Sequence, residues 1–184
     1  MARLPYLDPE HAAPSARAAF DRLPNKINIF RILLHLGECY APLLHLGGKI
    51  LTAQKLLPVL RELAILRVAR VSGSEYEWEH HKAHALRDGV TEEQIAALDA
   101  GRVTGASFDE TETAVLSFAD QLRLNVRPSD EALGAVRESL SDQEVVELTL
   151  TVGFYMLMAQ LMETTGVDVD AALGRDVIDA LTQD

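Results

Sequence analysis

The residues of this chain that could do chemistry concentrate in one short stretch, GSEYEWEHHKAH, at residues 73–84. It holds three of the six histidines and the only tryptophan. At helical spacing, the polar residues Ser74, Glu77, His81, His84 and, just beyond the stretch, Asp88 fall along one face. A glutamate one turn before a histidine forms a charge-assisted pair. This face therefore suits proton transfer or metal binding, although a polar helix face is also typical of simple exposure to solvent.

A second polar residue stands out in the preceding segment, PVLRELAILRVARVS, at residues 58–72. Glu62 shares its helical face with apolar residues such as Ile65. A carboxylate in an apolar stripe costs free energy unless it is paired or protonated. Two explanations remain open: a buried ion pair with an arginine such as Arg31 or Arg61, or an acid–base function.

Metal binding and nucleophilic catalysis have weaker support in the sequence. His80 and His84 lie one helical turn apart, a spacing that chelates zinc, but no glutamate follows the first histidine and no third ligand is identifiable. Ser74 is not part of a Gly-x-Ser-x-Gly turn, and together with Glu77 it predicts a capping box at a helix start. We therefore expect neither a metal nor another cofactor.

Composition and charge restrict the class of partner. The 184 residues include 48% hydrophobic and 24% charged residues, an ordinary globular balance. Seventeen basic residues against twenty-eight acidic ones give a net charge of -11, which argues against a nucleic-acid partner. Cys39 is the only cysteine, so the sequence contains neither an intrachain disulfide nor a Cys-x-x-Cys redox pair.

The sequence also predicts the location of the protein. Its first twenty residues lack the apolar run of a signal peptide. The longest uncharged stretch, LTLTVGFYMLMAQLM, has fifteen residues, whereas a membrane span needs roughly 20. We expect a cytoplasmic protein without a membrane partner, in which this stretch forms a core or interface helix.

Helical patterns run through nearly the whole chain, and no segment alternates apolar and polar residues as a strand does. The pattern predicts an all-α protein with a single domain spanning residues 1–184. The segment 141–166 is apolar on too many faces for a solvated helix, which favours self-association. The expected helices cover residues 14–23, two segments of 27–53 separated by Gly37, and then 58–72, 74–88, 91–101, 109–125, 129–140 and 141–166.

The segment RELAILRVARVSGSEYEWEHHKAHALRDGVTEEQIAAL, residues 61–98, resembles the signature of the carboxymuconolactone decarboxylase-like family. This family is part of the alkylhydroperoxidase D-like superfamily. The flanking segments 28–51 and 145–168 are similar to family members as well, so the resemblance covers most of the chain. It implies a compact helical fold that assembles into homotrimers or homohexamers.

In the peroxidase branch of that superfamily, the motif is a Glu, eleven residues, and then Cys-x-x-Cys-x-x-x-His. Laid on this sequence, the glutamate falls on Glu62, the histidine on His81, and the two cysteines on Ser74 and Glu77. Dithiol peroxidase chemistry needs an attacking and a resolving thiol, so that activity is not expected. The EYEW before the histidines is similar to the decarboxylase-like branch.

The resemblance implies acid–base chemistry on a small carboxylated lactone or related ring compound, without a cofactor. In that scheme His81 protonates carbon or stabilises an oxyanion, and Glu62 orients it. Two alternatives stay open: a lactone or enol isomerase or hydrolase, and a non-catalytic oligomer that binds a small ligand. The implied catalytic residues are Glu62, His81 and Glu77, and the implied substrate-binding residues are His80, His84, Trp78 and Tyr155.

Overall fold

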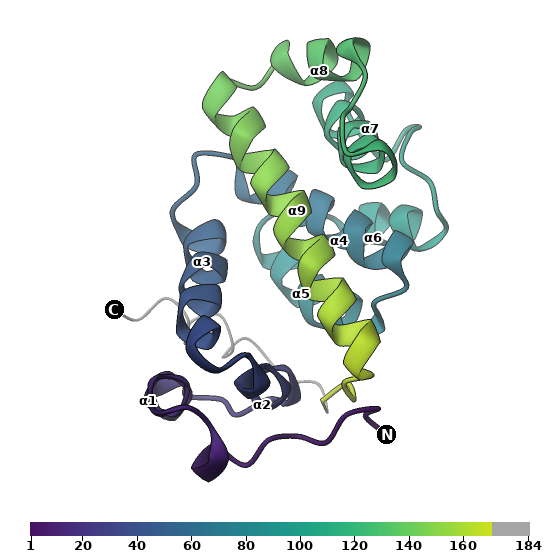
Figure 1. Cartoon of the computed structure of the whole chain (residues 1–184). Helices are drawn as coiled ribbons and strands as arrows, with labels where there is room; N and C mark the ends of the chain where they lie inside the picture. The colour runs from purple at the N-terminus through teal and green to yellow at the C-terminus, as the bar shows by residue number, and fades with distance from the viewer. Residues whose placement is uncertain (171–184) are drawn as a thin grey trace. The chain divides into compact units, whose positions relative to one another are not determined.

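Helices joined by short loops make up most of residues 1–170, which are the residues that the structure, a computed structural model, describes (Figure 1). No strand occurs in this part of the chain, and the predicted all-α class is confirmed. Short 3-10 helices cover Pro9–His11 and Leu34–Cys39. The α-helices are α1 (Pro14–Arg22), α2 (Asn28–Leu33), α3 (Tyr40–Thr52), α4 (Pro58–Ser72), α5 (Glu75–Arg87), α6 (Glu92–Asp99), α7 (Glu110–Asn125), α8 (Asp130–Arg137) and α9 (Asp142–Thr165).

The chain divides into two compact units. The first contains residues 1–53 together with the described residues from 161 onward. The second contains residues 54–160, and all the predicted site residues belong to it. The expectation of a single domain stays a prediction.

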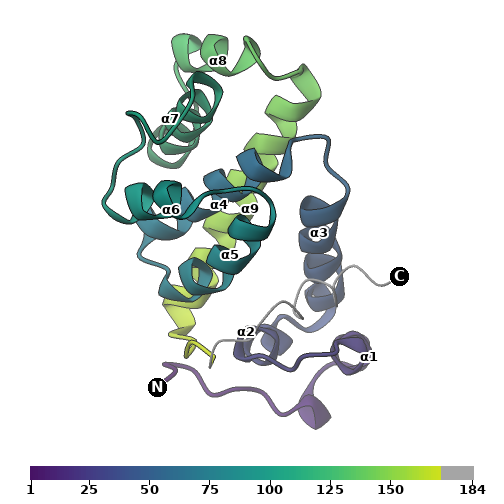
Figure 2. The same ribbon diagram turned by 180° about the vertical axis from the view of Figure 1, so that it is seen from behind.

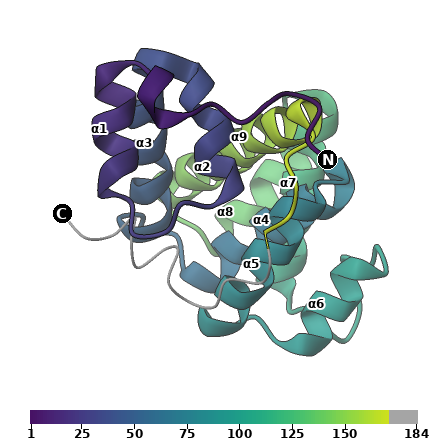
Figure 3. The ribbon, with the colours of Figure 1, turned by 90° about the horizontal axis from the view of Figure 1, so that it is seen from below.

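In the first unit, Gly37 separates α2 from α3 as the sequence predicts. Its φ of 57° is left-handed, a conformation that glycine adopts without a Cβ penalty. The 3-10 helix that contains it contacts α1, α2 and α3, which lie together in Figure 3. In the same unit, the backbone carbonyl of Thr165 accepts hydrogen bonds from the amides of Arg3 and Leu4 at 2.7 and 3.2 Å.

Helix α4 is the central helix of the second unit and packs against α5, α6 and α7 (Figures 1 and 2). Pro58 begins it, where the missing amide proton is not needed. Gly73 ends it in the left-handed conformation, with φ 67°. Nearly every residue between Leu60 and Ala69 is buried. A polar side chain in this part of the helix, such as that of Glu62, is therefore removed from water.

Two further helix starts fix the second unit. Thr91 and Gln94 form a capping box at the start of α6, and Asp109 and Glu112 form another at the start of α7. The apolar spacing in residues 109–125 predicts a stripe of Ala114, Val115, Phe118 and Leu122, but Ala114 and Leu122 are only half-buried. The fully buried face is instead made of Val115, Leu116, Phe118 and Ala119.

Helix α9 carries apolar residues on several faces, as the sequence predicts. Leu148, Val152 and Tyr155 are buried, whereas Val146 and Leu150 are 67% and 43% exposed. By length and composition alone α9 is apolar enough to cross a membrane, with 44% of its most apolar window buried in the structure. The core helix of a soluble protein meets the same criterion.

We predict opposite effects of the same substitution at two glycines. Gly73→Ala places a Cβ on a left-handed residue, where no atom lies within 4 Å of it, so the penalty of about 1 kcal/mol is purely conformational. Gly134→Ala, in the exposed middle of α8 and equally uncrowded, stabilises by about 0.5–1 kcal/mol. Urea unfolding of both variants measures the two signs. Equal signs would contradict the assigned end of α4.

Candidate functional site

Glu62 and His81 are in direct contact. Glu62 lies on α4 and His81 on α5, and His81 Nδ1 is 2.9 Å from Glu62 Oε2. Glu62 is 0% exposed and His81 is 8% exposed. The two helices form one of the closest packed pairs in this unit, which brings together residues nineteen positions apart.

The contact determines which nitrogen of His81 is available for chemistry. An ionised carboxylate has only acceptors, so Nδ1 is the donor and Glu62 the acceptor. In the neutral imidazole the lone pair then lies on Nε2, and in the protonated form Nε2 carries the second N–H. This arrangement holds the ring and leaves Nε2 to accept or donate a proton.

Arg61 compensates the buried negative charge of Glu62. Its guanidinium is 4% exposed, with Nε 3.4 Å from Glu62 Oε1. Its Nη2 donates to Asp88 Oδ2 at 2.8 Å, and Arg87 Nε donates to the other oxygen of Asp88 at 3.0 Å. Of the two ion-pair partners expected for Glu62, Arg61 is therefore the one observed. Arg31 lies in the first unit, with its guanidinium over the ring of Tyr6.

The ring of Tyr155, on α9, meets His81 edge-on, with the centroids 4.8 Å apart and the planes at 89°. Burial raises the pKa of the Tyr155 hydroxyl well above its ordinary value. The negative charges of Glu62 and Glu77 raise it further, and Arg61 opposes them. Tyr155 therefore stays protonated at neutral pH and is a hydrogen-bond donor beside the two carboxylates.

His84 lies one turn beyond His81, with the ring centroids 5.7 Å apart. Burial is the main cause that lowers the pKa of His84 to about 4, and the charge of His81 lowers it further. Glu62 and Asp88 act in the opposite direction. At neutral pH His84 is therefore an uncharged imidazole, which can donate or accept a hydrogen bond but cannot act as a cation.

Ser74 and Glu77 occupy the positions where the resemblance places two cysteines. Both are 1% exposed. The predicted capping box is wrong: Ser74 is the N-cap of α5, but its side chain makes no capping hydrogen bond. The backbone explains this, because Ser74 has ψ 89° rather than the extended value of a typical N-cap. Glu77 is thus a second buried carboxylate of the site.

The two remaining predicted residues lie on the flanks of α5. His80 stacks on Tyr76, with centroids 4.3 Å apart and planes at 21°. Trp78 is 5% exposed and belongs to a core cluster with residues such as Leu66 and Ala85. The guanidinium of Arg70 lies 5.3 Å from its ring centroid. The spacing of residues in the sequence could not show whether Trp78 faces a substrate or packs in the core, because in both cases the side chain lies off the polar face of α5.

Within residues 1–170, no group of three His, Cys, Asp or Glu side chains is arranged to hold a metal ion. Cys39 is exposed and lies in the first unit, whereas Ser74 and Glu77 lie in the second.

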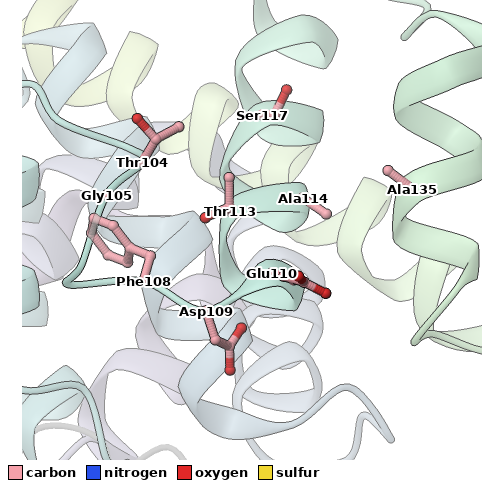
Figure 4. Close-up of a pocket in the computed structure, with 9 residues that line it drawn as sticks. All are labelled: Thr104, Gly105, Phe108, Asp109, Glu110, Thr113, Ala114, Ser117 and Ala135. Atoms are coloured by element: carbon pink, nitrogen blue, oxygen red, sulfur yellow. The ribbon is translucent and has the colours of Figure 1, made fainter.

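A separate surface cavity of about 460 Å³ lies beside the start of α7 (Figure 4). Its lining includes Thr104, Phe108, Thr113 and Ser117, and none of the predicted site residues.

The contact that sequence reasoning did not identify is the one between Arg61 and Asp88, which stand twenty-seven positions apart. The sequence placed Asp88 on the polar face of α5 but did not connect it with Arg61. No periodicity within one helix connects two such residues.

Solved structures share this fold. An uncharacterized peroxidase-related protein from Ralstonia eutropha JMP134, described as an alkylhydroperoxidase AhpD core, has a TM-score of 0.77 and 14% identity over 99% of this chain and 97% of that one. The debrominase Bmp8, crystallised with 2,3,4-tribromopyrrole, has a TM-score of 0.70 and 18% identity over 98% and 100%. A peroxidase-related protein from Silicibacter sp. TM1040 has a TM-score of 0.67 and 16% identity over 77% and 76%.

These likenesses define the class: the chain has the alkylhydroperoxidase D-like fold. Residues 38–121 match the model of the Carboxymuconolactone decarboxylase family, which confirms the resemblance found in the sequence. The matched segment includes Glu62, Ser74, Glu77 and His81. No curated protein sequence matches the chain.

We predict that His84 makes the protein less stable in acid. Its pKa falls from 6.5 to about 4 on folding, so the unfolded chain binds more protons between these values. The stability contribution is complete above pH 6.5 and is lost as the pH falls toward 4, by at most on the order of 3 kcal/mol. His84→Gln should flatten the dependence of unfolding free energy on pH in this window. An unchanged slope would show that His84 is not buried as a neutral imidazole.

Proposed function

We propose that the Glu62–His81 pair is a proton-transfer site, and that the protein is a carboxymuconolactone decarboxylase-like enzyme. The observation that carries the proposal is the 2.9 Å contact between His81 Nδ1 and a carboxylate that is 0% exposed. A histidine held in this way can take up and release a proton at Nε2. A surface position of Glu62 would have favoured a non-catalytic role instead.

The proposed substrate is a small lactone, or related ring compound, that carries a carboxylate. The bond between the ring carbon and the carboxylate breaks, carbon dioxide leaves, and the electron pair passes into the ring as an enolate or dienolate. His81 Nε2–H then gives its proton to the ring carbon, and solvent reprotonates the imidazole. In this scheme the hydroxyl of Tyr155, which stays protonated, donates a hydrogen bond to the enolate oxygen.

Glu62 and Glu77 have different parts in this scheme. Glu62 fixes the His81 ring and stabilises the imidazolium, because its oxygen accepts from Nδ1. Glu77 stands one turn before His81 and is the second buried carboxylate, so it completes the proposed acid–base group. His80, His84 and Trp78 remain proposed contacts of the substrate, with His84 acting as a neutral hydrogen-bonding group.

Proton transfer without decarboxylation is the second candidate. The cation closest to the pair, Arg61, is already engaged by Glu62 and Asp88, and His84 is neutral at pH 7. A substrate without a carboxylate therefore suits these groups as well, which favours a lactone or enol isomerase or hydrolase as the alternative. A ligand-binding oligomer without catalysis is the third outcome that the assay must separate.

We predict that Glu62→Gln and His81→Asn each lower turnover by about 10²–10⁴-fold without unfolding the protein. The assay follows carbon dioxide release from carboxymuconolactone, with deuterium incorporation from heavy water into the product. Glu79→Gln, an exposed glutamate on the same helix paired with Lys82, is the matched control and should retain wild-type turnover.

The same assay separates the alternatives. Deuterium exchange or ring opening of a lactone that lacks the carboxylate, without carbon dioxide release, would replace the decarboxylase by the isomerase or hydrolase. Saturable binding without turnover of either compound would leave the non-catalytic role. Wild-type rates in both Glu62→Gln and His81→Asn would mean that the pair is structural.

We also propose that the protein works as a homotrimer or homohexamer. Three apolar residues of α9 in the second unit, Val146, Leu150 and Leu157, share one face of the helix and are 67%, 43% and 43% exposed. An exposed apolar face of this kind is typical of a protein–protein interface.

We predict that light scattering at micromolar concentration gives a multiple of the 20.2 kDa chain mass, because obligate interfaces persist at this concentration. Leu150→Lys should lower the mass, whereas Leu124→Lys, at an exposed leucine of α7, should not. A 20.2 kDa particle for the unmodified chain would contradict the proposal.

A further inference from the structure

Asp88 is linked to the Glu62–His81 pair through one buried arginine. Asp88 is the C-cap residue of α5, and its side chain is 13% exposed. Arg61 Nη2 donates to Asp88 Oδ2 at 2.8 Å, and Arg61 Nε lies at the longer distance of 3.4 Å from Glu62 Oε1. The guanidinium is therefore bound more tightly to Asp88 than to the carboxylate that holds His81.

Charges alternate along this chain of contacts, from Arg87 at the surface through Asp88 and Arg61 to Glu62 and then His81. Arg87 is 43% exposed in its side chain, whereas Glu62 is 0% exposed. Because the interior is a poorer dielectric than water, a charge at one position changes the electrostatic potential at the next.

We infer that Asp88 is a positioning residue that sets the proton affinity of the Glu62–His81 pair, because it neutralises part of the positive charge of Arg61. This inference rests on the proposed proton-transfer function. With Asp88 ionised, part of the positive charge of Arg61 is neutralised at the end of α5. Glu62 therefore keeps more of its negative potential toward His81.

The other charged and titratable groups around His81 act on it as well. Helix α4 provides Glu62 and Arg61, and α9 provides Tyr155, which stays protonated at neutral pH. Helix α5 provides Glu77 one turn before His81, His84 one turn after it, and Asp88 and Arg87 at its end. Among these, Asp88 is the group that holds Arg61, and within the described residues no hydrogen bond or ion pair joins Asp88 itself to Glu62 or His81.

The test is nuclear magnetic resonance of the full-length protein with labelled histidine, which follows each imidazole as the pH changes. Asp88→Asn keeps an oxygen that accepts from Arg61 Nη2 but removes the charge. We expect the proton affinity of His81 to fall about 3- to 10-fold, because the full positive charge of Arg61 then acts on Glu62 and weakens its negative potential at His81. The pH–rate profile should move to lower pH by the same factor.

Asp120→Asn is the matched control. Asp120, on α7, accepts hydrogen bonds from Arg67 Nε and Nη2 at 2.8 and 2.9 Å. It therefore forms an ion pair with another arginine of α4, the helix that contains Arg61. Its charge does not belong to the chain of contacts that leads to Glu62. The titration of His81 should therefore change by less than about 2-fold. A change equal to that of Asp88→Asn would show that general loss of charge, and not Asp88, is responsible.

Arg87→Gln tests the opposite sign and involves an exposed side chain, so it remains informative if Asp88→Asn does not fold. Removing this cation leaves the negative charge of Asp88 less neutralised, so that Asp88 offsets more of the positive charge of Arg61. The proton affinity of His81 should then rise by about 2-fold. A fall in Arg87→Gln, or no change in Asp88→Asn, would overturn the role of Asp88.

Glu62→Gln separates this inference from the function on which it rests. If Glu62→Gln shifts the titration of His81 and Asp88→Asn does not, only the role of Asp88 is lost. If Glu62→Gln leaves the titration of His81 unchanged, the pair itself is not coupled, and the proposed function fails as well.

Discussion

The structure of the second unit depends on one buried carboxylate. Glu62 is 0% exposed within the buried part of α4, and an isolated ion there would be strongly destabilising. Two groups compensate it, one at each oxygen: Arg61, its neighbour on α4, and His81, from α5. Because the compensation comes partly from another helix, the same contact between Glu62 and His81 is needed both for packing α4 against α5 and for forming the proposed site.

The environment gives neighbouring side chains of one type different properties. His81 and His84 lie one turn apart on α5, yet only His81 is in contact with a carboxylate. His84 is buried beside His81, and its pKa is lowered to about 4. Two imidazoles one turn apart therefore differ through position alone, and the proposed function uses one as a proton carrier and the other as a neutral hydrogen-bonding group.

Much of the fold follows from local signals that the sequence contains. Pro58 and Gly73 mark the two ends of α4, Gly37 interrupts the segment before α3, and Thr91 with Gln94 starts α6. Glu62 stood out because a carboxylate on an apolar helix face requires a partner. The capping prediction for Ser74 failed because capping depends on the backbone angle at the N-cap, which the residue type does not determine. The link from Arg61 to Asp88 was not predictable, since it depends on how two helices are aligned.

That alignment has a mechanical consequence. Adjacent residues of α4, Arg61 and Glu62, hold α5 at two points, Asp88 and His81, which lie about 10 Å apart along the helix axis. A sliding or tilting motion of α5 along α4 would strain both contacts together, since both connect the same two helices. We therefore expect the site to assemble or come apart as a whole, because any displacement of α5 along α4 has to break or lengthen both contacts at once.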